Sequence, residues 1–586
     1  MSDKSNSQVT GRVPARTPLS PARNHAPLVG MVLLLALVCF VGLNRFALID
    51  LVDEGIYASI AREMLDSGDW ITPRYGNTIF FYKPPLTYWL QALFIYFLGA
   101  TPLAARLPSA IAAFLTAIAI YGWARRRTAL HMGQFAAVVY VCCPLVAFGL
   151  ARIAMMDSLV TLFFTLAVIG WIEGYSGDRK GYLLMAVGMG LATMTKGLIG
   201  FLLPGGAFAL WIFWRRDFEE LRRVPWFGVL ITFLALVLPW HLAAWRAHGN
   251  WFVAEYVGRQ HFQRFLGGDF AHQNPFWYYF PVMLASMFPW SGLIPIAWWR
   301  GLRANRSDRQ SLECAMSTWA LWAGFVFVFF SLSVSKLPNY ILPALPALSI
   351  LIGWRLNALW KHKRSLYPVE FVSLWLPGLI IGALVFVAGL TAYQGRSHPE
   401  SPSLIAKMLG RLFNWDEQSQ SVALLWKKLE MLTDLAPYWI ALGAILLVGS
   451  LAIIISWRRI ASTFAASLIL SLTLILFVTQ VGFPRWSARS AAPLNDLGMR
   501  TLPALQREEP LVMYAIHPKH PSLRYLLGHS EHVFETFSPE TLQSVLNDAG
   551  RGYVLTSAET PLTSLPGKFQ QEAAADGWVL WRYEKE

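Results

Sequence analysis

The chain has 586 residues, of which 55% are hydrophobic and 14% are charged. Soluble domains usually carry about 25% charged residues, so the composition excludes an ordinary soluble enzyme. Apolar stretches of about 18 residues or more, long enough to cross a bilayer as helices, recur along the chain. The net charge of +14 would suit nucleic-acid binding, but the basic residues stand at the ends of apolar stretches, as in membrane proteins. We therefore expect a polytopic α-helical membrane protein that contacts membrane lipids and binds no nucleic acid.

The N-terminal segment, residues 1–26, is rich in Ser, Pro and Arg, which predicts a disordered cytoplasmic N-terminus. The apolar run that follows has no small-residue cleavage pattern and is too long for a signal peptide, so we expect a retained anchor. Residues 27–481 then form the predicted membrane domain, with about thirteen transmembrane helices. Their expected centres lie near residues 38, 114, 142, 165, 187, 206, 234, 286, 325, 350, 379, 447 and 471.

Clusters of Lys and Arg predict the orientation of these helices, because such clusters mark cytoplasmic loops. They fall on every second connection, at residues 125–127, 215–223, 300–309, 361–364 and 458–459. The alternate segments then face the periplasm and hold most of the polar residues that could carry chemistry. These segments are residues 49–103, 151–157, 195–197, 244–275, 335–340, 391–436 and everything after about 482.

The C-terminal part of the chain has a different pattern. Hydrophobic runs shorten to strand length at residues 511–515, 552–556 and 578–583. Between them, Ser538 is a good cap for a helix that runs to about Asn547. We expect residues 482–586 to form a small periplasmic α/β domain packed over the membrane part, and it contains no catalytic motif.

Asp53, directly after the first apolar run, has two interpretations. It could be only the cap of an amphipathic helix, with Glu54 in the first turn and an apolar stripe at Ile56, Ile60 and Met64. Such a helix would lie on the membrane surface. Alternatively, the carboxylate could be catalytic.

Asp157 favours the second interpretation, although it too could be a helix cap. It ends the loop 151–157, which is expected on the same side of the membrane as Asp53, and Arg152 lies in the same loop. Two acids on one face of the membrane, each with an arginine nearby, indicate a functional pair more than coincidence.

Short motifs recur in order along these periplasmic segments. They comprise residues 53–64, 68–74, 82–85, 88–89, Arg152 with Asp157, and residues 195–197, 261–265, 272–279 and 335–343. In this order the motifs resemble GT-C glycosyltransferases of the protein O-mannosyltransferase-like family. The most similar branch is the bacterial lipid A 4-amino-4-deoxy-L-arabinose transferases. The resemblance covers roughly residues 30–350 and includes the topology.

The resemblance implies transfer of a sugar from a polyprenyl phosphate to an acceptor on the non-cytoplasmic side. It places Asp53 near the acceptor as the catalytic acid, with Asp157 as a second acid. Asp53 would be a general base for a hydroxyl acceptor, or an orienting group for an ionised phosphate. No serine or cysteine elbow for a covalent intermediate is present, so we expect direct displacement with inversion.

The leaving phosphate gains negative charge in the transition state, so fixed cations and donors beside it accelerate the reaction. The candidates for donor-phosphate binding are Lys83, Arg264, Lys336 and Tyr340. Lys83 could instead only reach toward the membrane surface, although the two prolines that follow it favour a fixed position. The further candidates for substrate binding are Glu54, Tyr57, Tyr82 and His261.

Tyr82 departs from the aminoarabinose branch, in which a glutamate characteristically precedes the loop lysine. That glutamate would be a natural partner for an amino sugar or for a metal. The sugar therefore stays open between aminoarabinose, a hexose and a uronic acid. His261 and His272 have no clustered carboxylate beside them, and the four cysteines lie in apolar runs. No metal site and no certain cofactor follow, although a divalent metal is compatible with the motifs.

The favoured interpretation is a monomeric enzyme of the bacterial inner membrane that moves 4-amino-4-deoxy-L-arabinose from undecaprenyl phosphate to lipid A phosphate. A protein O-mannosyltransferase-like activity and another hexose transfer to lipopolysaccharide or glycan remain alternatives. A secondary transporter is the alternative from another class, but it should bury ionisable residues near mid-membrane. Here most charges lie at the ends of the apolar stretches.

Overall fold

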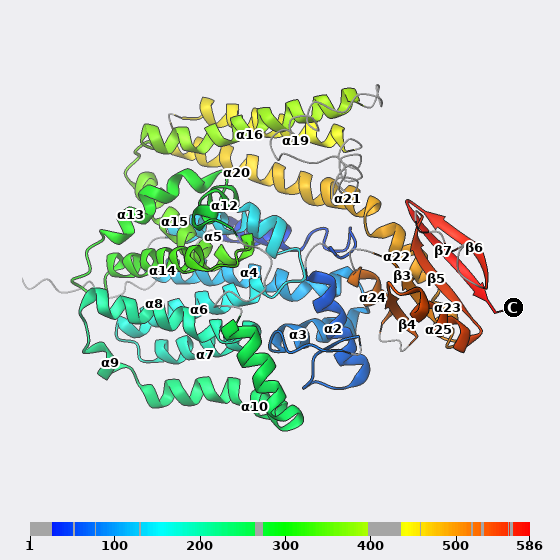
Figure 1. Ribbon diagram of the computed structural model, residues 1–586. Helices are drawn as coiled ribbons and strands as arrows, with labels where there is room; N and C mark the ends of the chain where they lie inside the picture. The colour runs from blue at the N-terminus through cyan, green and yellow to red at the C-terminus, as the bar shows by residue number, and fades with distance from the viewer. Residues whose placement is uncertain are drawn as a thin grey trace, which may run out of the picture.

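A helical body carries a smaller unit with a β-sheet at one end (Figure 1). This is a computed structural model. It describes residues 26–50, 53–76, 78–127, 130–263, 274–395, 435–457, 459–516, 520–528, 532–558, 560, 562 and 567–585. The predictions for the N-terminal segment and for the loop 391–436 fall almost entirely outside these residues.

Eight helical segments in the described residues are long and apolar enough to cross a membrane, or nine if one bent pair is counted as a span. The expected multi-pass membrane protein is therefore confirmed. The segments are α4 (Pro102–Arg127), α6 (Asp157–Tyr175), α10 (Trp226–Phe252) with η2 (Val253–Gln263), α14 (Leu312–Leu332), η5 (Pro338–Ala344) with α15 (Leu345–Lys361), α16 (Pro368–Gly395), α19 (Ala436–Ile455), and α20 (Ile460–Phe477) with η6 (Val478–Gly482) and α21 (Phe483–Arg489).

Other expected spans are shorter or broken. The span expected near residue 286 is bent by 116° between two halves. These halves are η3 (Phe276–Tyr278) with α12 (Tyr279–Ser286), and η4 (Trp290–Leu293) with α13 (Ile294–Leu302). Four more are helices of 12 to 17 residues, namely α1 (Ala26–Phe40), α5 (Leu130–Val141), α7 (Lys180–Lys196) and α8 (Ile199–Arg215). The π-helix η1 (Leu145–Leu150) follows α5. The total of thirteen stays a prediction.

Helix α6 is the centre of the body, with 89% of its apolar window buried, whereas only 17% is buried in α10 and in α16. Glycines let α6 and α7 approach closely. A Cβ on Gly170 would lie 2.4 Å from the Met185 nitrogen, and one on Gly181 would lie 2.3 Å from the Gly174 nitrogen. Small residues give this close packing between membrane helices, where hydrophobic burial gives little driving force.

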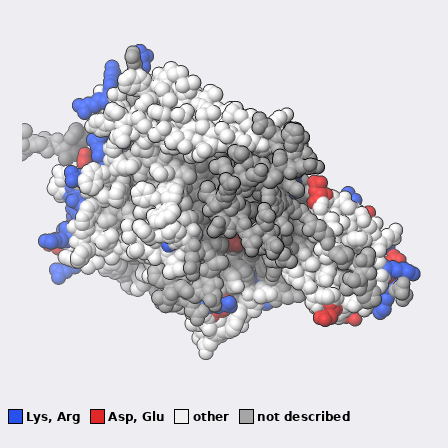
Figure 2. Space-filling view, turned by 45° about the horizontal axis from the view of Figure 1, so that its top comes forward, with Lys and Arg blue, Asp and Glu red and all other residues white. Residues whose placement is uncertain are grey.

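The arginine-rich connections gather on one side of the body. Arg127 forms an ion pair with Glu173 at 2.9 Å and donates to the Gln310 carbonyl, and Arg309 pairs with Asp217. The latter lies beside the short helix α9 (Glu220–Arg223). Figure 2 shows Lys and Arg along the left edge of a largely uncharged body. This arrangement agrees with the predicted alternation of basic and polar connections.

The C-terminal unit is built on a five-stranded sheet with strand order β4-β3-β5-β7-β6. Strands β4, β3 and β5 are parallel, and β7 and β6 complete the sheet antiparallel. The predicted strands at 511–515, 552–556 and 578–583 are confirmed, as is the helix capped by Ser538. The elements are α22 (Ala492–Met499), α23 (Leu502–Leu505), β3 (Leu511–Tyr514), α24 (Pro521–Leu527), β4 (Val533–Thr536), α25 (Pro539–Ala549), β5 (Arg551–Ser557), β6 (Lys568–Ala575) and β7 (Trp578–Glu584).

The first loop contains α2 (Glu54–Ser67), a hairpin of β1 (Arg74–Tyr75) and β2 (Thr78–Ile79), and α3 (Leu86–Leu98). Helix α2 packs between α3 and α24 (Figure 1). Of its expected apolar stripe, Ile60 and Met64 are buried.

The prediction of a helix on the membrane surface requires the polar side of α2 to face water, and this side is instead covered. Arg62 donates to the Leu526 carbonyl at 2.7 Å, and Glu63 pairs with Arg524 at 3.3 Å. The C-terminal unit therefore covers the side of α2 that was expected to face water.

Candidate active site

Asp53 lies at the head of α2 with an exposed side chain. Its backbone carbonyl accepts the first helical hydrogen bond, from the Tyr57 nitrogen at 3.0 Å, but its carboxylate makes no capping bond. Instead, Oδ2 accepts a hydrogen bond from the Tyr57 hydroxyl at 3.0 Å. A carboxylate that only stabilised the helix would bind backbone N–H groups, so the side chain is left available for another role.

Tyr57 is a buried donor to this carboxylate. Burial raises the pKa of Tyr57 well above its ordinary value, and the negative charges of Asp53 and Asp157 raise it further. The hydroxyl therefore stays protonated. Its ring lies 5.8 Å from the ring of Tyr88, which is also fully buried. The charges of both expected acids, Asp53 and Asp157, therefore act on Tyr57.

Asp157, at the start of α6, forms an ion pair with Lys196 at the end of α7. The Lys196 Nζ lies 2.6 Å from Oδ1, and the carboxylate side chain is only 5% exposed. The same ammonium lies 5.0 Å from the centre of the Tyr340 ring in η5. The structure thus brings together Asp157 and Tyr340, two predicted site residues, through a lysine to which sequence reasoning assigned no role. A lysine that ends an apolar helix on the expected periplasmic side was the available signal.

Glu54 is turned away from Asp53 and is fully buried. Its carboxylate pairs with the equally buried Arg106, with Nε to Oε1 at 2.8 Å. It also accepts from the Ile49 nitrogen at 2.7 Å and from the Ala154 nitrogen at 2.8 Å. These bonds tie the start of the first loop and the chain just before Asp157 to the head of α2.

Two buried arginines hold the segment after α1. Arg106 donates to the carbonyls of Leu43, Phe46 and Ala47 at 2.8 to 2.9 Å. Arg152 donates to the Val38 carbonyl at 2.7 Å and to that of Val41. The Val38 carbonyl is among the last of α1, which have no partners within the helix, and the other carbonyls belong to the segment that follows it. Arg152, which was expected only near Asp157, is therefore a structural residue.

Lys336 is 4% exposed and donates to the Asn274 carbonyl at 2.9 Å and to that of Ser333. Asn274 returns a hydrogen bond to the Lys336 carbonyl at 3.2 Å. The Tyr279 hydroxyl donates to the Leu337 carbonyl at 3.0 Å. In this arrangement the ammonium holds two chain segments together just before Tyr340.

Known proteins resemble this chain over part of its length. Residues 82–242 match a family model described as dolichyl-phosphate-mannose-protein mannosyltransferase. The undecaprenyl phosphate-alpha-4-amino-4-deoxy-L-arabinose arabinosyl transferase of Erwinia tasmaniensis is 34% identical over 314 residues, 51% of this chain and 54% of that protein. The protein of the same name from Aeromonas hydrophila is 32% identical over 350 residues, 58% and 62% of the two chains. The match therefore spans little more than half the length of these curated relatives.

A solved structure matches almost the whole chain. It is the crystal structure of ArnT from Cupriavidus metallidurans bound to undecaprenyl phosphate. The two structures agree with a TM-score of 0.75 at 21% sequence identity, over 96% of this chain and 98% of that one. The chain has the GT-C glycosyltransferase fold. The family resemblance of the motifs is thereby confirmed.

Within this GT-C fold, Lys83 and Tyr82 lie in the turn before α3. Lys83 is half-buried, and Tyr82 is 38% exposed with its ring 4.2 Å from that of Phe80. The fixed position and the phosphate-binding role expected for Lys83 stay predictions.

The side chains of two other predicted site residues lie outside the described part of the structure. Arg264 lies outside the described residues, and His261 is described only by its backbone in η2. In the described part of the chain, no three His, Cys, Asp or Glu side chains come together as a metal site. The described site thus consists of Asp53 with Tyr57, and of Asp157 with Lys196 and Tyr340.

Proposed function

We propose that this protein is an inverting membrane glycosyltransferase that takes a sugar from undecaprenyl phosphate. The observation that carries the proposal is the exposed carboxylate of Asp53, which stands at a helix start without capping it. Names of relatives that are more than 30% identical supply the donor class, since they use undecaprenyl phosphate-linked aminoarabinose. The acceptor oxygen would meet the sugar on the face opposite the leaving phosphate.

Asp53 would hold the acceptor in line with the anomeric carbon. The Tyr57 hydroxyl donates to its carboxylate and fixes the orientation of that group. A carboxylate held in this way suits both candidate roles, deprotonation of a hydroxyl acceptor and orientation of a phosphate acceptor. Tyr57 is therefore a positioning residue in this proposal.

The leaving phosphate would be held by Lys83, Arg264 and Tyr340, with Lys196 added from the structure. Lys196 faces Tyr340 while its charge is balanced by Asp157. Fixed charges of this kind need little reorganisation when negative charge develops on the phosphate.

We assign two of the expected ligands differently. Lys336 would order the segment that carries Tyr340, because its ammonium is bound to backbone carbonyls. Glu54 would be structural, because Arg106 and backbone N–H groups occupy its carboxylate. Tyr82 and His261 remain the proposed contacts to the sugar or the acceptor.

We further propose that the protein is a monomer in a bacterial inner membrane. The N-terminus and the arginine-rich loops would face the cytoplasm, and the C-terminal unit would face the periplasm. The separation of the arginine-rich end from α2 and α24 supports this orientation (Figures 1 and 2). Undecaprenyl-linked donors and lipid A would both be accessible there.

Lipid A phosphate with 4-amino-4-deoxy-L-arabinose is the favoured pair of substrates. The names of the relatives supply the sugar, and the resemblance of the motifs supplies the acceptor. Hexose transfer to a protein or a glycan is the second candidate. Tyr82 favours it, because an exposed aromatic ring beside that of Phe80 offers no negative charge to an amino sugar.

Mass spectrometry of lipid A and of glycoproteins tests the proposal. The cells lack the chromosomal gene and carry the wild-type or variant gene on a plasmid. Asp53→Asn should abolish the aminoarabinose signal, whereas Asp66→Asn, a change of an acid on the same helix, should leave it. Unchanged lipid A with altered glycoproteins or glycans would favour the second candidate. If folded D53N protein restores every product as wild type does, the proposed role of Asp53 is wrong.

A further inference from the structure

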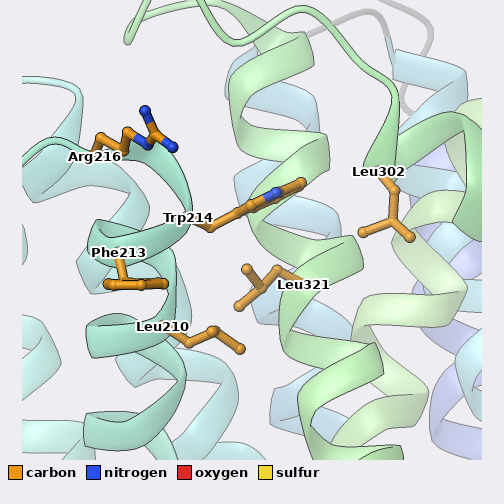
Figure 3. Close-up of a pocket in the computed structure, with 6 residues that line it drawn as sticks. All are labelled: Leu210, Phe213, Trp214, Arg216, Leu302 and Leu321. Carbon is orange, nitrogen blue, oxygen red and sulfur yellow. The ribbon is translucent and has the colours of Figure 1, made fainter.

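A cleft lies between α8 and α14 at the arginine-rich end of the body (Figure 3). Helix α2 lies at the other end of the body (Figure 1). The volume of the cleft is about 560 Å³. Most of its lining is apolar, and a single charged side chain stands at its edge. The lining residues are Leu210, Phe213, Trp214, Arg216, Leu302 and Leu321.

The cleft opens at the membrane boundary. Helix α8 ends at Arg215 and α13 ends at Leu302, so the lining spans the last turns of two apolar helices. The Phe213 side chain is 69% exposed and that of Leu210 is 41% exposed. Trp214 projects into the gap between the helices (Figure 3). An apolar cleft at this depth is accessible to hydrocarbon chains from one leaflet.

Cations surround the mouth of the cleft. Arg216 is exposed and takes a left-handed conformation, φ 54°, which few residues other than glycine adopt. The guanidinium of Arg306 lies 3.9 Å from the Trp214 ring centre, and that of Arg303 lies 4.2 Å from the Trp299 ring centre. A guanidinium stacked on an aromatic face keeps its N–H edge free for an anion.

The carboxylates nearby have other partners. Asp217 and Glu220 both pair with Arg309, and Asp217 also accepts from the Tyr175 hydroxyl at 2.7 Å. In the described residues, neither Arg216 nor Arg306 forms an ion pair with a carboxylate. Burial and then the charge of Arg215 lower the pKa of Arg306. The mouth therefore carries positive charge that the protein does not neutralise.

We propose that this cleft binds an anionic phospholipid, with one acyl chain between α8 and α14 and the phosphate between Arg216 and Arg306. The hydrocarbon would cover Leu210, Phe213 and Leu321, and the headgroup would neutralise the arginine pair. A zwitterionic phospholipid has the same chains and a phosphate but no net negative charge, so it would bind less well. This site is independent of the proposed sugar transfer.

Crosslinking of the wild-type protein tests the site directly. The full chain is placed in nanodiscs of phosphatidylethanolamine that contain a small fraction of phosphatidylglycerol with a photoreactive acyl chain. A photoreactive phosphatidylethanolamine is the comparison. We expect labelling of peptides 202–216 and 302–321 to be about tenfold stronger with phosphatidylglycerol. Equal labelling by the two lipids, or labelling by an added polyprenyl phosphate alone, would overturn the proposal.

A matched pair of double variants separates the site from general surface charge. R216Q/R306Q removes an exposed arginine and one stacked on an aromatic ring. R125Q/R126Q does the same at the end of α4, where Arg125 lies over Tyr121 and Arg126 is exposed. The first variant should lose the preference for phosphatidylglycerol, and the second should keep it. An equal loss in both variants would show nonspecific attraction and contradict the site.

A third variant, Leu210→Trp, fills the cleft without changing charge. It should reduce labelling of both peptides although the arginines remain, and full labelling of L210W would place the lipid elsewhere. The wild-type peptide map decides the question even if an arginine variant fails to fold.

Discussion

The two ends of the helical body differ in how much of their charge is exposed. Around α2, the pair of Glu54 and Arg106 is fully buried, and its atoms are bonded within the protein. At the other end, Arg216 is exposed and the pair of Glu219 with Arg223 lies at the surface, although the pair of Arg355 with Glu370 is buried. A buried pair leaves an uncompensated charge when one partner is removed, whereas a surface pair loses little. Substitution of Glu54 should therefore matter far more than substitution of Glu219.

Glu54→Gln is expected to have the largest effect on stability. It leaves the Arg106 charge buried without its counter-ion, which costs about 3–5 kcal/mol. The measurement is the midpoint of thermal unfolding of the purified protein in detergent. Glu219→Gln is the matched change at the other end, where the carboxylate side chain is 79% exposed, and it should cost less than about 1 kcal/mol.

A second substitution checks the cause of this loss. In E54Q/R106M the buried charge is gone, so much of the stability should return. Equal midpoints for E54Q and E219Q would contradict the contrast between the two ends. An active, stable E54Q protein that binds substrate poorly would instead restore the original prediction of Glu54 as a ligand.

The contrast also explains what could be predicted from the sequence. Composition and the spacing of basic clusters depend on the membrane itself, so the multi-pass class could be predicted. Strand-length runs in the C-terminal part likewise predicted β3, β5 and β7. The strands β4 and β6 were missed, since β6 is a polar edge strand with a mostly exposed burial pattern.

The site was harder to predict because its partners come from distant segments. The charges of Asp53 and Asp157 both act on Tyr57, and the catalytic roles of the two acids stay predictions. Glu54 is the next residue after Asp53, yet its side chain is buried in the protein. Which side of α2 is buried depends on α24, more than 450 residues later in the chain. Lys196 gains its place only when the end of α7 meets the start of α6.

Lys196→Met is expected to lower turnover about a hundredfold, as the loss of one preorganised charge does at other active sites. The substitution also leaves Asp157 without its partner. Steady-state kinetics with a short-chain polyprenyl phosphate sugar donor would show the loss in kcat more than in KM. Lys180→Met, at the exposed opposite end of α7, should leave turnover unchanged.

Lys196→Arg distinguishes charge from folding. It should recover part of the turnover, since it restores a cation beside Asp157 and Tyr340. If K196M and K180M show the same kinetics, Lys196 has only a structural role.

Tyr57→Phe should lower turnover by about five- to tenfold, which corresponds to the loss of one hydrogen bond of about 1 kcal/mol. The raised pKa of Tyr57 keeps the hydroxyl protonated, and its bond to Asp53 is lost only as the pH rises through that raised value. The ratio of wild-type to Y57F rates should therefore be constant between about pH 7 and pH 11, a range that includes the ordinary pKa of tyrosine. A ratio that falls toward the alkaline end would show that Tyr57 titrates near its ordinary pKa.

Asp50→Ala should have the most local effect, because α24 is held to the first loop at several points. The Asp50 carboxylate accepts from the Ser522 nitrogen at 2.7 Å, from its hydroxyl at 2.6 Å and from the His520 Nδ1 at 3.1 Å. Arg62 and the pair of Glu63 with Arg524 remain in the variant, so we expect a local loss of about 1–3 kcal/mol.

Hydrogen exchange of residues 523–527 measures the loss at Asp50. Exchange there should become faster in D50A while the membrane helices keep their protection. Asp548→Ala, at an exposed position near the end of α25, should leave the whole pattern unchanged. If exchange in D50A spreads through α2 as well, the C-terminal unit holds the helix that carries Asp53. Turnover should then fall together with protection, whereas exchange confined to α24 would make this unit a cover that the site does not need.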